Sequence, residues 1–403
     1  MVSNIVLALT ALAGFSSITY AAIIFLHILS IIYCRIHCNK KREPPPPDKA
    51  PGISILKPLV GIDPNLADNL ESHFTVDYPK YELLFCINDE CDPAISIVKP
   101  LMSKYPKVDC QLFIGGHPVG INPKINNMMP AYLASKYDFV MISDAGIRIS
   151  NESIPDLVFH MKDNVGMVHQ MPITVHRKGF AALVEMVYFG CAQARVYIGG
   201  NLLGFLVPTG MCCLLRKSVL EDGGGIAQFG KYIAEDYFIA KYMLSRGFKV
   251  AIGSYWSLQN HGFYSISSHQ ARMARWSKLR QAMLPTLYVF DPLIECIALG
   301  IFTAWGSYYL YHVHPVVFFL CHLLVWFLLD YIQILGVYND KLPFGKFEFA
   351  MAWMTREILT IFTYLQSLWS PDFKWKTGTY KLKWGGEAIK VKQKDYTVLN
   401  HLV

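Results

Sequence analysis

The 403-residue sequence has ten cysteines but lacks any C-x-x-C pair. Structural zinc sites and dithiol redox sites commonly use that spacing, so its absence argues against both. The cysteines are scattered along the chain, which is unlike the disulfide framework of a small secreted protein. We therefore expect reduced thiols that pack as small hydrophobic side chains.

Charge is also scarce. Asp, Glu, Lys and Arg make up 17% of the residues and the net charge is only +7, without a basic stripe along one domain, so nucleic acid is a poor candidate partner. In contrast, 53% of the residues are hydrophobic, above the roughly 45–50% of a soluble globular protein. The composition indicates a soluble domain joined to membrane helices, with an anionic membrane surface or a phosphorylated substrate as partner.

The longest uncharged run is at the N-terminus, where residues 4–34 contain no Asp, Glu, Lys or Arg. It exceeds the roughly 20 apolar residues that cross a bilayer, so we expect a transmembrane anchor. The linker that follows, residues 35–50, is basic and contains four consecutive prolines. By the positive-inside rule, the N-terminus faces the lumen and the next domain faces the cytosol.

A second membrane region is expected at residues 286–370. Its apolar runs at residues 293–311 and 315–335 predict a transmembrane hairpin. The segment 349–369 is also apolar but contains Arg356 and Glu357.

Two interpretations of residues 349–369 remain open. A crossing would place the lysine-rich tail, residues 371–403, in the lumen, against the charge rule. We therefore prefer a re-entrant or interfacial helix, which leaves the tail as a basic cytosolic extension.

Residues 51–285 alternate between short β-rich runs and helical stretches, which predicts an α/β domain with a parallel sheet. Ligands of such sheets bind beyond the carboxyl ends of the strands, so residues just after each run are candidate site residues. The expected strands are "GISILKPL", "YELLFCIND", "VDCQLFIG" and "YDFVMISD".

Two aspartates follow these strands. Asp144, in "ISDAGIRIS", could offer carboxylate oxygens to a divalent cation that holds a diphosphate, or could merely cap the next turn. Asp92, in "NDECDPA", could bind ligand or could be the N-cap of a helix with Pro93 at its first position.

A third acidic site lies in "AEDYFIAKYM", where Glu235 and Asp236 begin an expected amphipathic helix. The pair could simply stabilise the helix N-terminus, or Asp236 could act as a general base on an incoming hydroxyl.

The run "HQARMARWSK" places Arg272 and Arg275 three residues apart on an expected helix, hence on one face, with Trp276 beside them. Guanidinium groups suit phosphate oxygens, and an indole can form a flat apolar wall. The alternative is a basic helix start that rests on anionic lipid, and only the combination with the carboxylates favours a site.

That combination resembles a known signature. Asp92, Asp144, Asp236 and the R-x-x-R-W run are similar to the D, D, D, (Q/R)-x-x-R-W signature of inverting family-2-type glycosyltransferases. The runs "GINPKINN", "PTGMCCLLRK", "EDYFIAK" and "TGTYKLKWGG" resemble the ceramide glucosyltransferase family, and the resemblance covers almost the whole chain.

The resemblance implies a GT-A type nucleotide-diphospho-sugar transferase domain over residues 51–285. It implies transfer of glucose from UDP-glucose to the primary hydroxyl of ceramide, with inversion to a β-glycoside. Asp92 and Lys124 would bind the nucleotide, and Asp144 would hold Mg2+ or Mn2+ on the diphosphate. Asp236 would be the general base.

The resemblance also implies that Arg272 and Arg275 neutralise the departing diphosphate, while Trp276 walls the acceptor site. One position departs from the common D-x-D pattern of GT-A enzymes, because Gly146 stands where the second Asp would be. The chain thus lacks one expected metal ligand, which Glu235 or water could replace.

The membrane segments then suit a cytosolic active site, in the Golgi by resemblance, that meets a lipid acceptor and a water-soluble donor. The apolar stretch 182–205 could line the lipid entrance or be an ordinary core helix. A processive polysaccharide synthase and a non-catalytic membrane scaffold are the alternatives to the glucosyltransferase.

Overall fold

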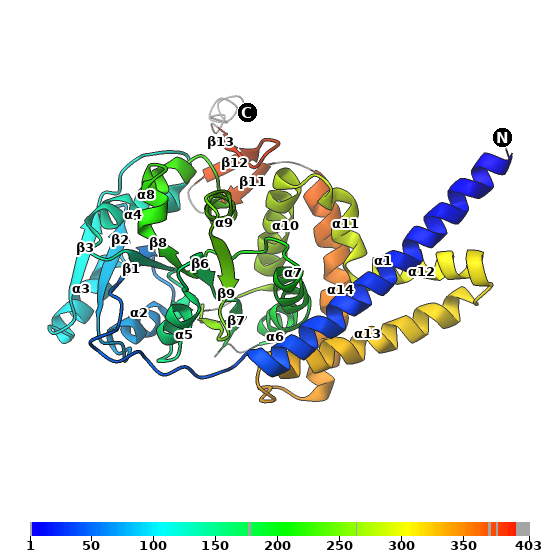
Figure 1. Ribbon diagram of the computed structural model, residues 1–403, viewed down its shortest axis with the longest axis horizontal. Coiled ribbons are helices and arrows are strands. Elements are labelled where there is room, and N and C mark those ends of the chain that lie inside the picture. The colour runs from blue at the N-terminus through cyan, green and yellow to red at the C-terminus, as the bar shows by residue number, and fades with distance from the viewer. Residues whose placement is uncertain (1, 176–178, 263, 370–371, 376–377, 392–403) are drawn as a thin grey trace, which may run out of the picture.

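The computed structural model describes residues 2–175, 179–262, 264–369, 372–375 and 378–391. Figure 1 shows an α/β domain on one side and long helices that extend away from it on the other.

A seven-stranded mixed sheet in the order β3-β2-β1-β4-β8-β6-β9 forms the centre of the α/β domain. Neighbouring strands β3, β2, β1 and β4 run parallel, as expected, whereas β8 is antiparallel to both β4 and β6. The expectation of a parallel sheet is thus right for the first four strands and wrong around β8. The strands are β1 (Ile53–Leu59), β2 (Tyr81–Ile87), β3 (Cys110–Ile114), β4 (Phe139–Ser143), β6 (Val165–His169), β8 (Cys212–Arg216) and β9 (Lys249–Ile252).

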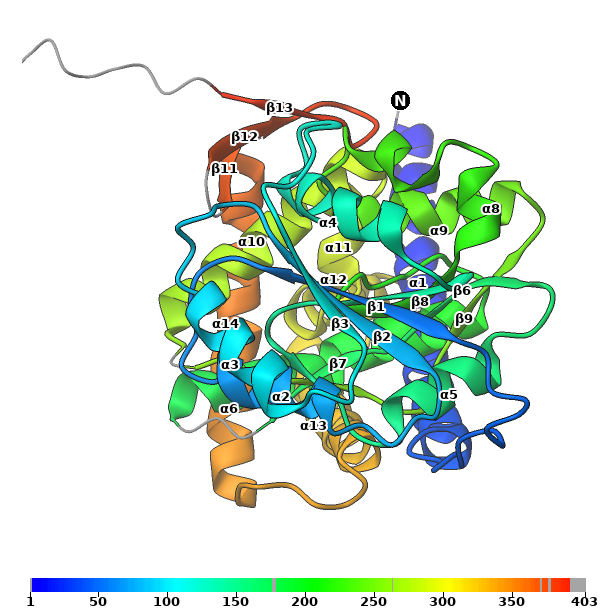
Figure 2. The same ribbon diagram turned by 90° about the vertical axis from the view of Figure 1, so that its left-hand side faces the viewer.

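Helices cover both faces of this sheet (Figure 2). In β2, Leu83 and Phe85 join the core on one face while Leu84 and Cys86 join the core on the other, as the two-residue repeat of a buried strand requires. Helices α2 (Leu66–Phe74), α3 (Ile95–Lys104) and α5 (Ser153–His160) pack on the first face. Helices α4 (Pro123–Ala134), α8 (Lys217–Glu221) and α9 (Glu235–Ser245) pack on the second, with the 3-10 helix η3 (Gly225–Phe229).

A second, small sheet joins β5 (Ile147–Arg148), β10 (Ser257–Gln259) and β7 (Pro172–Thr174). After β10 the chain enters the long helix α10 (Ile266–Met283), which carries the R-x-x-R-W run.

The stretch 182–205 is a continuous but irregular helix. It consists of α6 (Phe180–Val187), the π-helices η1 (Tyr188–Gln193) and η2 (Arg195–Gly199), and α7 (Gly200–Leu202). Most of its side chains are buried, as in the core-helix alternative, whereas Phe180 at its start and the large apolar side chains at its C-terminal end are exposed.

Two helices of the described chain are long and apolar enough to cross a membrane, within α1 (Val2–His37) and α13 (Pro315–Val337). Helices α11 (Leu287–Leu293) and α12 (Cys296–Tyr311) meet at 89° and would form a third span if taken together. Small residues bring α1 and α12 close: a Cβ at Gly306 would lie 2.0 Å from Ser16 Oγ.

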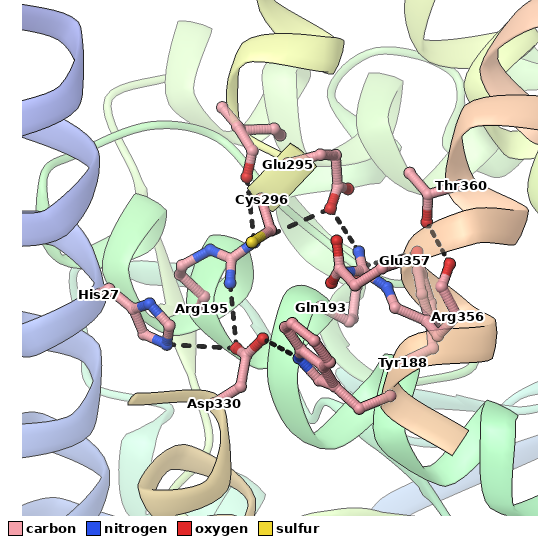
Figure 3. A network of polar contacts seen from close by, with 12 residues as sticks. His27, Tyr188, Gln193, Arg195, Glu295, Cys296, Asp330, Arg356, Glu357 and Thr360 are labelled. Carbon is pink, nitrogen blue, oxygen red and sulfur yellow. Dashed lines mark hydrogen bonds and ion pairs between the residues drawn. The ribbon is translucent and has the colours of Figure 1, made fainter. Parts of the chain in front are cut away.

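Helix α14 (Lys346–Trp369) follows α13 and contains the two charges that made this segment ambiguous. Arg356 and Glu357 are both buried and paired, and Arg356 also contacts Glu295 at the α11–α12 corner (Figure 3). Nearby, Asp330 of α13 accepts hydrogen bonds from Trp353 Nε1 (2.8 Å) and Arg195 Nη1 (3.2 Å).

These contacts hold α14 against α13 and η2 by charge as well as by packing. The C-terminal end of α14 reaches α10, where Ser367 Oγ lies 3.3 Å from Ser277 Oγ. The C-terminal end of α14 therefore lies beside the α/β domain, and the interfacial interpretation stays our prediction for this helix.

The chain ends in a three-stranded sheet that the sequence analysis missed. Strands β11 (Asp372–Trp375), β12 (Gly378–Leu382) and β13 (Ala388–Lys390) pack on α10 through Phe373, Tyr380 and Leu382. The basic tail expected over residues 371–403 therefore contains folded strands, because alternate side chains of these strands are apolar and bury against the domain. Residues 392–403 lie outside the described part.

Candidate active site

Lys124 joins two carboxylates at the start of α4. The side chain of Asn122 caps this helix and accepts the backbone N–H of Lys124 at 2.8 Å, which fixes the first turn. Lys124 Nζ lies 2.8 Å from Asp144 Oδ1 and 3.0 Å from Glu235 Oε1. Burial alone lowers the pKa of Lys124, but these carboxylates outweigh it and raise the pKa above its usual value. Lys124 is therefore a permanent cation in the centre of an acidic site.

Asp144 leaves β4 in a turn that is held from both sides. Its backbone N–H donates to Met211 O at 2.9 Å, and its carbonyl accepts from Lys57 Nζ at 2.7 Å. Lys57 is fully buried, and burial lowers its pKa to about 7 although Asp144 opposes the shift. The sequence analysis missed Lys57, and a lone lysine within the apolar strand "ISILKPL" was the available signal.

Asp236 occupies the second position of α9, as expected, and is held by backbone donors. Its Oδ2 accepts from Gly210 N and its Oδ1 from Tyr237 N, both at 2.8 Å. Lys124 Nζ donates to the carbonyl of the same Gly210 at 3.0 Å. Burial and the neighbouring Glu235 raise the pKa of Asp236 to about 6, against the effect of Lys124. The carboxylate is ionised at neutral pH yet more basic than an ordinary aspartate, which suits a general base.

Gly210 cannot be replaced easily, because an added Cβ would lie 2.9 Å from Asp236 Cβ. The Gly210–Met211 segment before β8 therefore touches Asp236, Lys124 and Asp144, so these three predicted residues share one site.

Arg272 reaches the same segment from α10, and its Nη2 lies 3.5 Å from Met211 Sδ. Its guanidinium is already paired: Nη1 donates to Glu185 Oε1 at 3.0 Å and Nη2 to Gln259 Oε1 at 2.7 Å. Glu185 is fully buried on α6 and was not among the predicted residues. Arg272 thus has fewer free donors for a diphosphate than the R-x-x-R-W signature predicts. Its contact with Glu185 holds α10 against α6.

Arg275 differs from Arg272. Within the described part of the chain it makes no hydrogen bond or ion pair. Burial, followed by the repulsion of Arg272, lowers the pKa of Arg275 to about 10, so the group remains charged at neutral pH. The Arg272 guanidinium lies over the indole of Trp276, 4.6 Å from the ring centroid. Trp276 also packs on Phe189 and the C-terminal sheet.

Asp92 has a different position from the other predicted residues. Its carboxylate accepts backbone N–H groups of Gly61 (Oδ2, 2.9 Å) and Ala94 (Oδ1, 2.8 Å), and it therefore pins the loop after β1. The expected helix with Pro93 at its first position is wrong, since α3 begins at Ile95 and Asp92 caps the preceding turn. In the described residues no contact joins Asp92 to Lys124, and its nucleotide role stays a prediction.

Gly146 has a tertiary explanation. A Cβ at this position would lie 1.9 Å from Cε1 of His261, whose imidazole lies over the turn after Asp144. The volume that a second carboxylate would occupy is therefore filled by an imidazole ring. Among the described residues no group of three or more His, Cys, Asp and Glu side chains is placed to hold a metal.

We predict that Gly146→Asp, which restores the D-x-D pattern, lowers activity at least about tenfold instead of raising it, because the new side chain collides with His261. The same collision should destabilise the Gly146→Asp protein. The double variant Gly146→Asp/His261→Ala should recover part of that lost stability, measured as the melting temperature in detergent. If Gly146→Asp alone is as stable and active as the wild type, this account of Gly146 is wrong.

The sequence pattern of Glycosyl transferase family 21 matches residues 22–388. The chain belongs to this family. Curated relatives include ceramide glucosyltransferase 3 of Caenorhabditis elegans, which is 39% identical over 391 residues. The match covers 96% of this chain and 84% of that protein. Ceramide glucosyltransferase 1 of the same organism is 40% identical over 385 residues, or 93% and 82% of the two chains. A ceramide glucosyltransferase of Komagataella phaffii is 28% identical and covers 73% and 70%.

The family 21 chain also resembles a solved mannosyltransferase of Pyrobaculum calidifontis in complex with GDP-Man and Mn2+. The TM-score is 0.50 at 16% identity, and the match covers 89% of this chain and 99% of that one. At this identity the likeness shows the fold alone, and it confirms the expected GT-A architecture.

Proposed function

We propose that this protein transfers glucose from UDP-glucose to the primary hydroxyl of ceramide. The observation that carries the proposal is the site around Gly210, whose N–H binds the partly buried Asp236 and whose carbonyl binds Lys124, a cation held between two further carboxylates. Support also comes from the membrane helices and from the names of the family 21 relatives.

In this mechanism Asp236 takes the proton of the acceptor hydroxyl. The hydroxyl oxygen forms a bond to the anomeric carbon while the bond from that carbon to UDP breaks on the opposite face, which inverts the configuration. The electron pair leaves with UDP, whose diphosphate gains negative charge. Arg275, which makes no ion pair within the described residues, supplies a cation that can balance this charge. Lys124 holds the acidic side chains in place during the step.

A divalent cation fits this site only in part. Asp144 and Glu235 each provide a carboxylate, but Asp144 Oδ1 and Glu235 Oε1 are both bound to Lys124, and the imidazole of His261 lies at the Gly146 turn. The donor diphosphate and water would have to supply the remaining ligands of Mg2+ or Mn2+. When bound, the cation would neutralise the charge of the diphosphate. Asp92 is proposed to bind the nucleotide.

The protein would act from the cytosolic face of a Golgi membrane, where ceramide remains in the bilayer and UDP-glucose is in solution. The basic linker after α1 supports this orientation by the positive-inside rule.

The proposal is tested with purified full-length protein in nanodiscs, given ceramide and either labelled UDP-glucose or UDP-galactose, with and without EDTA. The expected product is a single β-glucosylceramide. A ladder of longer saccharides would point to a processive synthase, and binding of UDP-glucose without any transfer would point to a scaffold.

The pKa of Asp236 predicts the pH dependence of this reaction. Because a base must be deprotonated and burial raises this pKa to about 6, activity should be constant above about pH 7 and fall below pH 6. The slope should approach tenfold per pH unit. Initial rates in nanodiscs between pH 5 and 8 measure it, and an acid limb centred near pH 4 would contradict the assignment.

A further inference from the structure

The segment that contains Gly210, whose N–H donates to Asp236, is unusually apolar along its length. From residue 196 to residue 215 the chain has no Asp, Glu, Lys, Arg or His. The stretch runs from η2, through α7 and the loop before Gly210, into β8. Its middle is not buried: Leu202 is 37%, Leu203 50% and Phe205 65% exposed. Soluble surfaces seldom present adjacent large apolar side chains without a binding partner.

The exposed side chains are held in place by the backbone. Phe205 N–H donates to Gly200 O at 2.9 Å, and Asn201 Nδ2 donates to Val207 O at 3.2 Å. Gly204 has φ of 81°, a conformation that favours glycine and turns the chain back on α7. The loop is therefore a fixed structure, and its apolar side chains project from a defined position.

One end of this segment lies against the membrane anchor. A Cβ at Gly199 would lie 2.6 Å from Leu26 Cδ1 of α1, so the two helices touch directly. Close by on α1, Phe25 and Ile28 are 59% and 42% exposed, as expected for side chains that face lipid. The exposed apolar surface of α1 thus leads towards Leu202 and Leu203.

The other end lies at the candidate base. Gly210 N–H donates to Asp236 Oδ2, and Gly210 is only five residues after Phe205. Five residues span at most about 18 Å even when fully extended. An extended lipid chain whose hydroxyl head reaches Asp236 can therefore pass over Phe205 on its way to the bilayer.

We propose that Leu202, Leu203 and Phe205 form an entry lip for the hydrocarbon chains of the lipid acceptor, between α1 and the Gly210 segment. This inference rests on the proposed function, because it takes the acceptor to be a ceramide. It adds a chain-binding subsite and a direction of entry, and it explains why large apolar side chains are exposed on one fixed loop close to Asp236.

The lip is tested by photolabelling of the full-length protein in nanodiscs. The probes are a ceramide and a phosphatidylcholine that carry the same diazirine in the acyl chain. Ceramide should label residues 202–206, and excess unlabelled ceramide should compete. Equal labelling by phosphatidylcholine without competition by ceramide would show a general membrane contact and overturn the proposal, as would absence of label from this loop.

A kinetic arm uses Leu203→Ser/Phe205→Ser. Loss of two apolar contacts should lower kcat/KM for ceramide by about tenfold or more and leave the KM for UDP-glucose within about twofold. Phe205→Leu should retain most activity, and Leu133→Ser, which alters a 65% exposed leucine on α4, is the matched control. Unchanged kcat/KM, or an equal loss in the control, would refute the lip.

The wild-type protein separates the two levels of the argument. If it forms no glucosylceramide, the proposed function fails, whereas the labelling result still reports on lipid entry. If it is active and the lip variants behave like the control, only the lip fails.

Discussion

Asp236→Asn should reduce glucosyl transfer by about 10²–10⁴-fold, the usual contribution of a general base. The amide oxygen can still accept the Gly210 N–H, but the side chain can no longer take a proton. Affinity for UDP should change little. Among the described residues, Asp236 makes no direct contact with Lys124, the predicted nucleotide-binding residue, and the two are connected only through Gly210. Single-turnover rates and UDP titration in nanodiscs measure the two quantities.

Loss of activity in this variant should not reflect unfolding. Burial and Glu235 raise the pKa of Asp236, which means that the fold disfavours its ionised form above pH 6. A neutral asparagine removes that cost but keeps only one of the two oxygens that accept backbone N–H groups, so the melting temperature at pH 7.5 should change little. Normal turnover by a folded Asp236→Asn protein would refute the assignment of the base.

Arg275→Gln should lower UDP affinity and transfer by about 10²-fold or more, since it removes the cation that lacks a described protein partner. Because Arg275 makes no ion pair in the described fold, its loss should leave the melting temperature nearly unchanged. Arg275→Lys keeps the charge and should restore part of the UDP affinity, which tests for an electrostatic role.

Arg272→Gln is the matched comparison on the same helix. It would leave the buried Glu185 without its Arg272 partner, which costs about 3–5 kcal/mol for a buried pair. We therefore expect a clear drop in melting temperature for Arg272→Gln and none for Arg275→Gln. If both variants lose UDP affinity with equal stability, the two arginines share one role and the distinction drawn from their contacts is wrong.

Much of the α/β domain could be predicted because buried strands and amphipathic helices leave local patterns. The first four strands match β1 to β4 to within two residues at each end. Strand β8 could not be oriented, because "CCLLR" carries no mark of direction, and only its partners β4 and β6 make it antiparallel. The C-terminal strands were missed since their lysines obscure the apolar residues that bury on α10.

The sequence predicted the site as a set of residues, and the fold brings part of that set together. Lys124, Asp144 and Asp236 meet at the Gly210 segment. Asp236 lies 112 residues after Lys124 (236 − 124), and closeness over that distance comes only from the sheet. Lys57, Glu185 and His261 were missed because each acts through a neighbour that is far away in the chain.

The sequence by itself determined that this protein has a long apolar N-terminal helix, an α/β sheet and acidic residues at strand ends, because hydropathy and periodicity are local properties of the chain. Only the tertiary structure decided that Arg272 is paired while Arg275 has no ion pair among the described residues, that His261 fills the place of a missing aspartate, and that Leu203 and Phe205 remain exposed. Those outcomes depend on which side chains from distant segments compete for the same space and the same hydrogen bonds.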